Sequence, residues 1–275
     1  STTAWVTVYS DSSCGTFVDD GASPLTFTAP TAGTYYVHWT VNASCATSTT
    51  NFETTTITEN SSPPPPPPSN AFCDDFESYN VNDPIAETSP NWNTWGELTP
   101  PYATSPFTDD ANVTNTLSNS GSNALYFIDA TGSGGPQDIV LMFDTTQNIT
   151  STTPLSTPYT TGSLHCSQMM YIVPGKTGYF NFQAENTPGI TWALEVNFDV
   201  NGNILMTNTN STYPSGIYPI GVWFEVRFEI DLTANNWEIF IDGVSQGSFS
   251  NSINQIASLD LFPAVSSEYY VDDVC

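Results

Sequence analysis

Residues 223–244 read WFEVRFEIDLTANNWEIFIDGV, and they give the clearest indication of the fold. Two segments rich in aromatic and β-branched residues, 223–230 and 237–241, have the composition of β-strands. Asp242-Gly243 follows the second segment directly and is a strong signal for a tight turn. We therefore expect the chain to return from Val244 as the partner strand of a β-hairpin.

Short strand segments of the same kind fill residues 71–275, and helical periodicity is almost absent there. About a dozen such segments over about 200 residues predict an all-β, two-sheet jelly roll. The clearest further strands are expected at residues 124–128, 139–143, 167–173, 179–183 and 192–198.

Residues 1–60 form a smaller β-module, with strands expected at 5–9, 25–28, 34–40 and 54–58 and a turn at Asp19-Asp20-Gly21. These strands are few for an independent sandwich. We therefore expect the module to be truncated at its N-terminus and the chain to be part of a larger protein. An incomplete sandwich can accept a strand from a neighbour, so other copies of the protein are candidate partners.

Six consecutive prolines, Pro63–Pro68, separate the two modules. Polyproline is extended at about 3.1 Å per residue, so residues 61–70 are expected to be a semi-rigid linker.

Acidic residues dominate the charge: 28 Asp and Glu stand against Lys176 and Arg227, which gives a net charge of −26. Such a chain repels phosphate backbones, so we expect no nucleic-acid partner. Anionic membranes and acidic polysaccharides are poor partners for the same reason, unless a cation bridges them. No stretch reaches the roughly 20 consecutive apolar residues of a membrane helix, so we expect no direct membrane insertion.

Five cysteines in a Ser-, Thr- and strand-rich chain favour an oxidising compartment, and we expect a secreted or cell-surface protein. If the modules fold independently, Cys14 pairs with Cys45. We favour a second pair between Cys73 and Cys275, because they flank the larger module and the terminal strands of sandwiches are often adjacent. Cys166 is then a buried free thiol, although its pairing with either end stays open.

The larger module contains the segments FCDDFESY (72–79), AETSPNWNTWG (86–96), GYFNFQ (178–183), WALEV (192–196), WFEV (223–226), FIDG (240–243) and YVDDV (270–274). Through these segments, which span residues 72–275, its sequence resembles laminin-G/concanavalin-A-like jelly-roll modules of surface proteins exported by the type IX secretion system of gliding Bacteroidota. Residues 1–60 resemble the Ig-like repeats of the same proteins, above all in AGTYYV (32–37). The resemblance implies an adhesin, a lectin-like binder or an accessory domain of a polysaccharide-degrading enzyme.

Carboxylates stand near both ends of the larger module: Asp74, Asp75, Glu77, Asp272 and Asp273. If the terminal strands are neighbours, these groups converge and cannot all ionise cheaply without a cation. Calcium takes oxygen ligands, and the resembled modules often hold it at the corresponding place. We expect a structural Ca²⁺ site here; the alternative is that strand alternation turns half of these carboxylates to solvent.

Trp92 and Trp95, with Tyr102 nearby, form a candidate glycan-binding platform, because sugars stack their C–H faces on exposed aromatic rings. Core packing is the alternative, since tryptophan is usually mostly buried, and we expect at least one of the two rings in the core.

Catalytic signatures are missing from the sequence. The resembled fold includes laminarinase-type enzymes with a Glu-x-Asp-x-x-Glu strand, and the nearest match here has Glu195 but Asn197 and Val200 at the other two positions. Glu225 and Glu229 lie about 13 Å apart along one strand, too far for a carboxylate pair. Glu195 and Glu225 could still meet across strands.

We therefore expect a non-enzymatic, secreted cell-surface adhesin or structural binding module, whose partner is a surface glycan or another copy or module of a large surface protein. The alternative from another class is the glycan-binding accessory region of a secreted polysaccharide-degrading enzyme. A hydrolase in its own right would need two carboxylates at about 5–9 Å in a cleft.

Overall fold

The computed structural model describes residues 5–10, 16–22, 25, 35–41, 72–143, 158–213 and 215–275. The chain divides into two compact units, Ser1–Pro67 and Pro68–Cys275, and each is described by itself. The expected linker at 61–70 and the expected Cys14–Cys45 pair lie outside the described residues, as do the strand at 54–58 and most of the strand at 25–28.

In the first unit, the described strands form an antiparallel sheet in the order β2-β1-β3. They are β1 (Trp5–Tyr9), β2 (Phe17–Ala22) and β3 (Tyr36–Thr40), so the strands expected at 5–9 and 34–40 are present. The turn expected at Asp19-Asp20-Gly21 is wrong, because these residues lie within β2 and pair with β1. Their position at the edge of the described sheet lets the carboxylates face water, and Trp5 Nε1 donates to Asp20 Oδ2 at 3.0 Å.

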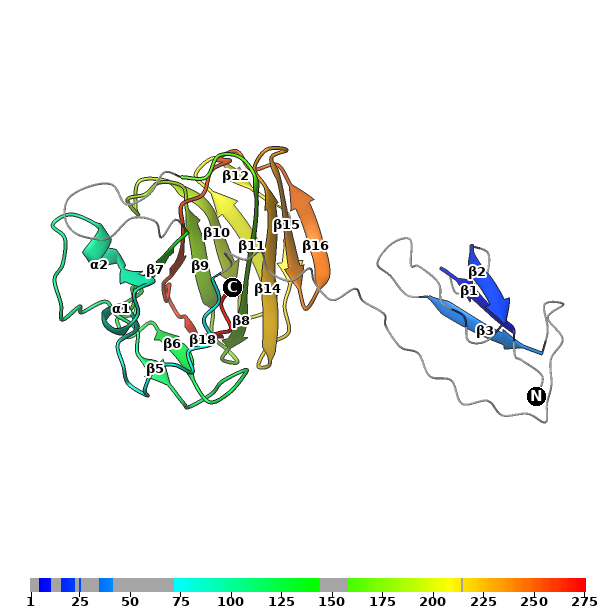
Figure 1. The fold of residues 1–275 in the computed structure, drawn as a ribbon, viewed down its shortest axis with the longest axis horizontal. Coiled ribbons are helices and arrows are strands. Elements are labelled where there is room, and N and C mark those ends of the chain that lie inside the picture. Colours follow the sequence, from blue (N-terminus) through cyan, green and yellow to red (C-terminus); the bar gives the residue numbers. More distant parts are fainter. Residues whose placement is uncertain are drawn as a thin grey trace. The chain divides into compact units, whose positions relative to one another are not determined.

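The second unit contains two sheets, which we call sheet I and sheet II (Figure 1). Sheet I has the order β12-β11-β10-β9-β17-β7-β4, with β13 paired to β11. Its strands are β4 (Trp92–Thr94), β7 (Ile139–Met142), β9 (Gly178–Gln183), β10 (Trp192–Phe198), β11 (Asn203–Asn208), β12 (Ser211–Thr212), β13 (Gly216–Ile217) and β17 (Ser258–Leu261).

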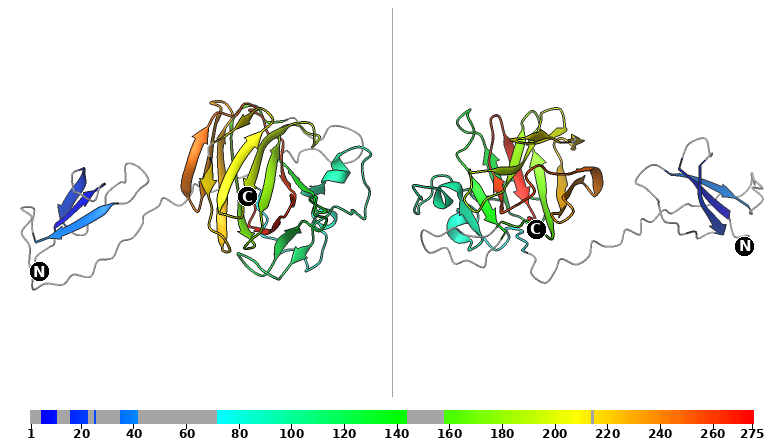
Figure 2. Two further views of the ribbon diagram at one scale, coloured as in Figure 1. Left: turned by 180° about the vertical axis from the view of Figure 1, so that it is seen from behind. Right: turned by 90° about the horizontal axis from the view of Figure 1, so that it is seen from above.

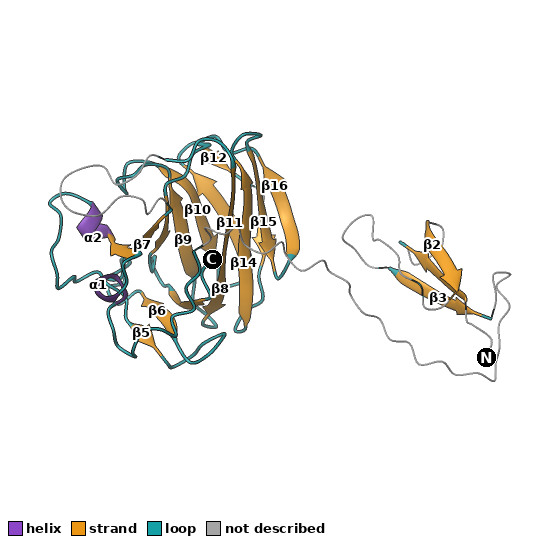
Figure 3. Cartoon of the chain, in the orientation of Figure 1, coloured by secondary structure: helices purple, strands orange, loops and turns teal. Residues whose placement is uncertain are grey.

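Sheet II has the order β16-β15-β14-β8-β18-β6-β5. Its strands are β5 (Val113–Thr114), β6 (Ala124–Ile128), β8 (Ser163–Ile172), β14 (Trp223–Asp231), β15 (Asn236–Ile241), β16 (Val244–Phe249) and β18 (Glu268–Asp272). Two short helices, α1 (Ile85–Thr88) and α2 (Trp95–Leu98), pack against β4 and are purple in Figure 3.

Aromatic side chains from both sheets meet in one core. Phe182 of β9 in sheet I lies edge-on to Phe228 of β14 in sheet II, with 5.2 Å between ring centroids. Trp237 of β15 is 6.2 Å from the same Phe182 ring, and all three side chains are buried. The neighbouring strands of both sheets pair antiparallel, and Figure 2 shows them from two further directions. The expected all-β, two-sheet jelly roll is confirmed.

The hairpin expected at residues 237–244 is present between β15 and β16, where Ile241 pairs with Val244. Asp242 and Gly243 have positive φ angles of 49° and 74°. Positive φ at both central residues is the condition for a tight turn that matches the twist of its strands, and Asp-Gly meets it at low cost.

The two ends of the second unit are joined. Asp74 and Val274 exchange backbone hydrogen bonds of 2.8 and 3.0 Å, and next to them Cys73 and Cys275 form a disulfide. This is the pair favoured from the sequence, and Cys166 is a buried free cysteine as expected. Among the described residues, no helix is long and apolar enough to cross a membrane.

Candidate functional site

The outward face of sheet I carries polar side chains in its middle. Strand alternation turns Phe180 and Phe182 of β9 into the core and Asn181 to the other face. On that face, Asn181 lies directly between Glu195 of β10 and Asp260 of β17, its two cross-strand partners. Three polar groups from three adjacent strands therefore stand in one row.

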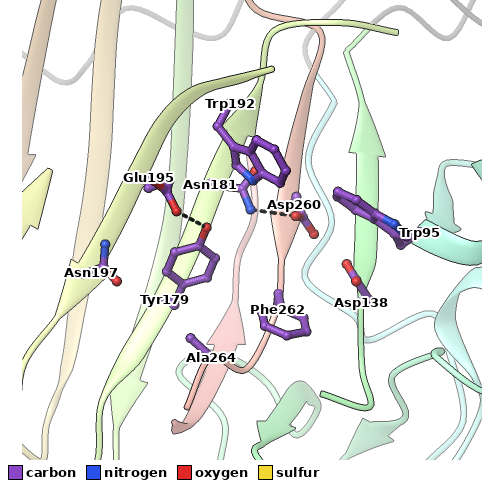
Figure 4. A pocket seen from close by; sticks show the side chains of 10 residues that line it. All are labelled: Trp95, Asp138, Tyr179, Asn181, Trp192, Glu195, Asn197, Asp260, Phe262 and Ala264. Carbon is purple, nitrogen blue, oxygen red and sulfur yellow. Dashed lines mark hydrogen bonds between the residues drawn. The ribbon is translucent and has the colours of Figure 1, made fainter. Parts of the chain in front are cut away.

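This row belongs to an open cleft of about 550 Å³ (Figure 4). Its aromatic residues come from β9, β10, α2 and the segment after β17, and its polar residues come mainly from the central strands of sheet I. The lining residues are Trp95, Asp138, Tyr179, Asn181, Trp192, Glu195, Asn197, Asp260, Phe262 and Ala264.

Two tryptophans stand together at one side of the cleft. Trp95 and Trp192 have ring centroids 6.3 Å apart and nearly parallel planes, at 28°. Trp95 packs against a small apolar cluster made of Leu98 of α2 and Val140 and Met142 of β7. Gly189 approaches its ring so closely that a Cβ there would lie 2.7 Å from the indole, and its φ of +87° also favours glycine. The position of Trp95 is thus fixed by packing.

A chain of hydrogen bonds holds the polar floor. The backbone N–H of Gly189 donates to Gln183 Oε1 at 2.9 Å, and Gln183 Nε2 donates to Asn181 Oδ1. Asn181 Nδ2 in turn donates to Asp260 Oδ2 at 2.6 Å, as Figure 4 shows. Asn181 and Asp260 are 1% and 2% exposed, so the chain defines their orientation beneath the aromatic side chains.

Glu195 is outside this chain of hydrogen bonds and has a partner of its own. The hydroxyl of Tyr179 donates to Glu195 Oε1 at 3.1 Å (Figure 4). Burial, together with the nearby carboxylates of Glu195 and Asp260, raises the pKa of Tyr179 well above its usual range. The phenol therefore stays protonated and keeps donating to the carboxylate over the whole physiological range.

Asp138 and Asp260 form an acid pair at the bottom of the cleft. Burial and the neighbouring carboxylate of Asp260 raise the pKa of Asp138, and burial raises the pKa of Asp260 to about 6. Two adjacent carboxyl groups in a poorly solvated place hold one proton between them more readily than two negative charges. The buried Oδ1 atom of each residue has no hydrogen-bond partner among the described residues.

Of the three residues predicted as a glycan platform, the structure places only Trp95 in the cleft. Trp92 is 1% exposed and lies in the core, where its Nε1 donates to Asp74 Oδ2 at 2.9 Å. The expectation that at least one of the two rings is core therefore fits. Tyr102 is 50% exposed but does not line the cleft, so the platform of Trp92, Trp95 and Tyr102 is not formed as one surface.

The carboxylates near the two ends of the second unit accept local hydrogen bonds. Glu77 Oε1 accepts from the backbone N–H groups of Ser122 and Asn123, at 2.7 and 2.6 Å. Asp272 is fully buried, accepts from the N–H groups of residues 119 and 120, and has a pKa raised by burial to about 6. Asp273 accepts from Ser120 Oγ at 2.7 Å.

Asp74 points the other way, into the core, where Phe76 N, the Tyr79 hydroxyl and Trp92 Nε1 donate to it. Asp75 accepts from the N–H of Glu77 at 3.2 Å. In the part of the chain that the structure describes, no three His, Cys, Asp or Glu side chains group into a set that could hold a metal. The two terminal segments are neighbours through the Asp74–Val274 bridge, but the five carboxylates do not form such a set, and calcium at this end stays a prediction.

The incomplete catalytic motif lies in the cleft. Glu195 and Asn197 line it from β10, while Val200 lies beyond the strand and is 45% exposed. Glu225 lies on β14 of sheet II, where it pairs with Arg227 at 3.6 Å. Glu195 and Glu225 therefore belong to different sheets and form no cross-strand pair.

Sequence reasoning missed most of the cleft, including Asp138, Asn181, Trp192 and Asp260. The local signal of Asn181 and Asp260 is a polar residue between two core residues of a strand, as in Leu259-Asp260-Leu261. Such a signal identifies the outward face of each strand but not which strands are neighbours.

No protein-family model and no curated protein matches the chain. Solved structures of similar fold include a carbohydrate-binding module from Bacillus subtilis, at 10% identity and a TM-score of 0.38, covering 67% of this chain and 93% of that one. A galectin of Caenorhabditis elegans is 11% identical with a TM-score of 0.33, over 45% of this chain and 90% of that one. A sialidase is 13% identical with a TM-score of 0.43; the match covers 70% of this chain but spans only 18% of the sialidase. At these identities and scores the likenesses carry no argument about function.

Proposed function

We propose that the second unit is a glycan-binding module and that the cleft on the outward face of sheet I is its binding site. The observation that supports this most is the combination of aromatic rings at the sides with a polar floor. A sugar ring has apolar C–H faces and hydroxyl groups around its edge. It can therefore stack on Trp95 or Trp192 while its hydroxyls reach the floor.

The floor supplies both kinds of hydrogen-bonding group. Glu195 can accept hydrogen bonds, and the amide of Asn197 can both donate and accept. The chain of hydrogen bonds from Gly189 to Asp260 holds this floor before a ligand arrives. A pre-organised site spends less binding free energy on ordering its side chains, which favours a module whose task is binding.

A glycoside hydrolase is the second candidate, because the cleft contains Glu195 and the Asp138–Asp260 pair. Retaining enzymes separate their two carboxyl groups by about 5–5.5 Å, and inverting enzymes separate them further. Asp260 is 2% exposed and already accepts from Asn181, so it is poorly placed to act on a substrate. The residue that would complete the laminarinase-type strand is Asn197 instead of a carboxylate. We therefore propose that the module binds glycans without cleaving them.

Cleavage is checked by incubating the full chain with soluble polysaccharides and measuring new reducing ends and new C=C absorbance. We expect neither. Turnover that is lost in Asp138→Asn would instead make the cleft an active site.

We further propose that the module acts outside the cell, as an adhesive part of a larger surface protein. The Cys73–Cys275 disulfide supports an oxidising compartment, and the resemblance to surface proteins of the type IX secretion system supports the cell surface. The alternative, an accessory region of a secreted polysaccharide-degrading enzyme, uses the same cleft.

The binding proposal is tested by titrating glycans into the full chain in a calorimeter. Trp192→Ala should weaken binding by about tenfold or more, since a stacked ring is worth about 1.4 kcal/mol or more. Trp223→Ala is the matched control, because Trp223 lies on the outward side of sheet II, against Tyr171. Equal affinities for wild type and Trp192→Ala would contradict the proposal.

A further inference from the structure

We infer that the cleft takes neutral or basic sugars and rejects acidic ones, that is, uronates, sialates and sulfated glycans. This inference rests on the proposed glycan binding and names the class of glycan. It follows from where the charges of the chain lie.

Both basic side chains of the chain are placed, and neither lines the cleft. Lys176 pairs with Glu268 at 3.0 Å. Arg227 lies on β14 of sheet II between Glu225 and Glu229, and its guanidinium is 3.9 Å from the ring centroid of Phe240. Proteins usually bind a sugar carboxylate or sulfate through arginine or lysine, because these supply charge-assisted hydrogen bonds. The cleft is lined by no such group.

The cleft is negative instead. Glu195 is one carboxylate, and the Asp138–Asp260 pair keeps one negative charge while it holds one proton. The aromatic side chains reduce the solvation of these groups, so a further negative charge would stand close to them with little screening by water. An anionic sugar would lose its hydration and gain no counter-charge.

Neutral sugars carry no charge that would lose its hydration or be repelled by the carboxylates of the cleft. Their hydroxyls donate to carboxylates, and hydrogen bonds to ionised acceptors are stronger than neutral ones. A protonated amino sugar would add an ionic attraction. Negative charge in the cleft therefore favours the same ligands that the aromatic residues favour.

The test compares forms of one oligosaccharide that differ only in charge. Neutral β-glucan, mannan and galactan oligosaccharides are titrated into the full chain, each beside its C6-oxidised uronate form and the methyl ester of that form. A chelator is present throughout, so that no divalent cation can bridge two carboxylates.

We expect the neutral form and the ester to bind about tenfold or more tightly than the uronate. The difference should persist in about 1 M salt, where the Debye length is about 3 Å and the overall net charge of the chain is screened. A uronate that binds as tightly as its ester would overturn this inference and leave glycan binding standing. If none of the glycans binds, the proposed function itself fails.

The Glu195→Gln variant tests whether charge in the cleft causes the difference in affinity between the uronate and its ester. The glutamine keeps a hydrogen-bond acceptor but removes one charge from the cleft, so the gap between uronate and ester should narrow several-fold. Glu238→Gln is the control, since Glu238 lies on the outward side of β15 in sheet II, where Ser245 donates to it. A gap that narrows equally in both variants would mean that net charge, not the cleft, discriminates.

Discussion

Trp92 and Trp95 lie only three residues apart, and they have different tasks. Trp92 is in β4, where its ring enters the core and its Nε1 bonds to Asp74. Trp95 begins α2, and its ring packs with Val140 and Met142 on the outward face of sheet I. An offset of three residues puts two strand side chains on opposite faces, and this offset decides which tryptophan can reach a ligand.

A pair of variants separates these tasks. Trp92→Phe should lower the free energy of unfolding by roughly 2 kcal/mol, because a hydrogen bond to a carboxylate is lost, and should leave glycan affinity unchanged. Trp95→Ala should weaken glycan binding by about tenfold. Denaturant unfolding and calorimetric titration measure the two effects. Weaker glycan binding in Trp92→Phe at unchanged stability would contradict this assignment.

Asp260→Asn tests the acid pair through its pH dependence. An unfolded Asp titrates near about pH 3.9, whereas burial raises the pKa of folded Asp260 to about 6. Between these values the folded chain holds more protons than the unfolded one, so the wild type loses stability as pH rises through this window. Asp138, whose pKa is also raised, extends the loss to higher pH.

Asparagine stays neutral at every pH and can still accept from Asn181. The midpoint of thermal unfolding of Asp260→Asn should therefore exceed that of the wild type by roughly 3 °C or more at neutral pH, and this difference should shrink toward pH 4. Scanning calorimetry measures the midpoints of the wild type and of Asp260→Asn at neutral pH and near pH 4, with Glu238→Gln as the control. A difference that does not change with pH would argue against a shared proton.

At the scale of elements, the order of the strands builds the cleft. Asn181 and Glu195 come from the consecutive strands β9 and β10, but Asp138 and Asp260 come from distant parts of the chain, and the strand order β10-β9-β17-β7 brings all four together. The Asp242-Gly243 turn could be predicted because it depends on adjacent residues only. The cleft could not, because alternation specifies the face of a residue but not the neighbour of its strand.

Sheet II has an aromatic ladder on its outward side. Tyr126, Tyr270, Tyr171 and Trp223 are direct cross-strand partners on β6, β18, β8 and β14. Their rings contact in sequence, with centroids 4.7, 6.1 and 5.9 Å apart, but at interplanar angles of 36°, 75° and 56°. Rings so inclined pack against one another more than they form a flat platform, which makes Trp223 a suitable control position.

The terminal strands give a third prediction. Cys73 and Cys275 are 202 residues apart in sequence, and in the chain-entropy model a loop of this length is worth on the order of 5 kcal/mol. The Cys73→Ser/Cys275→Ser double variant should therefore melt roughly 10–20 °C lower than the wild type. Cys166→Ala, at the buried free thiol, should cost far less. Equal midpoints for wild type and double variant would contradict a stabilising bridge.

At the scale of the whole molecule, a net charge of −26 opposes compactness. Raising the salt concentration from about 10 mM to about 1 M shortens the Debye length from about 30 Å to about 3 Å and should raise the midpoint of thermal unfolding. Calorimetry of the full chain at neutral pH measures this. An unchanged midpoint would mean that the self-repulsion is already balanced locally.

The effect of calcium binding on thermal unfolding can be separated from the screening of charge by salt if calcium chloride and sodium chloride are compared at the same ionic strength. A site that uses Asp75 and Asp273 should give a higher midpoint in calcium than in sodium chloride, and excess chelator should remove the gain. The Asp75→Asn/Asp273→Asn double variant should show no such gain. Identical midpoints of thermal unfolding for the wild type in both salts would contradict a calcium site at the ends of the second unit.

A crystal structure of the full chain with its tightest-binding neutral oligosaccharide would show the binding site itself. We expect a sugar ring stacked on Trp95 or Trp192, with its hydroxyls bonded to Glu195 or Asn197. Ligand density over Tyr171 and Trp223 on sheet II, with the cleft of sheet I empty, would contradict the proposed site.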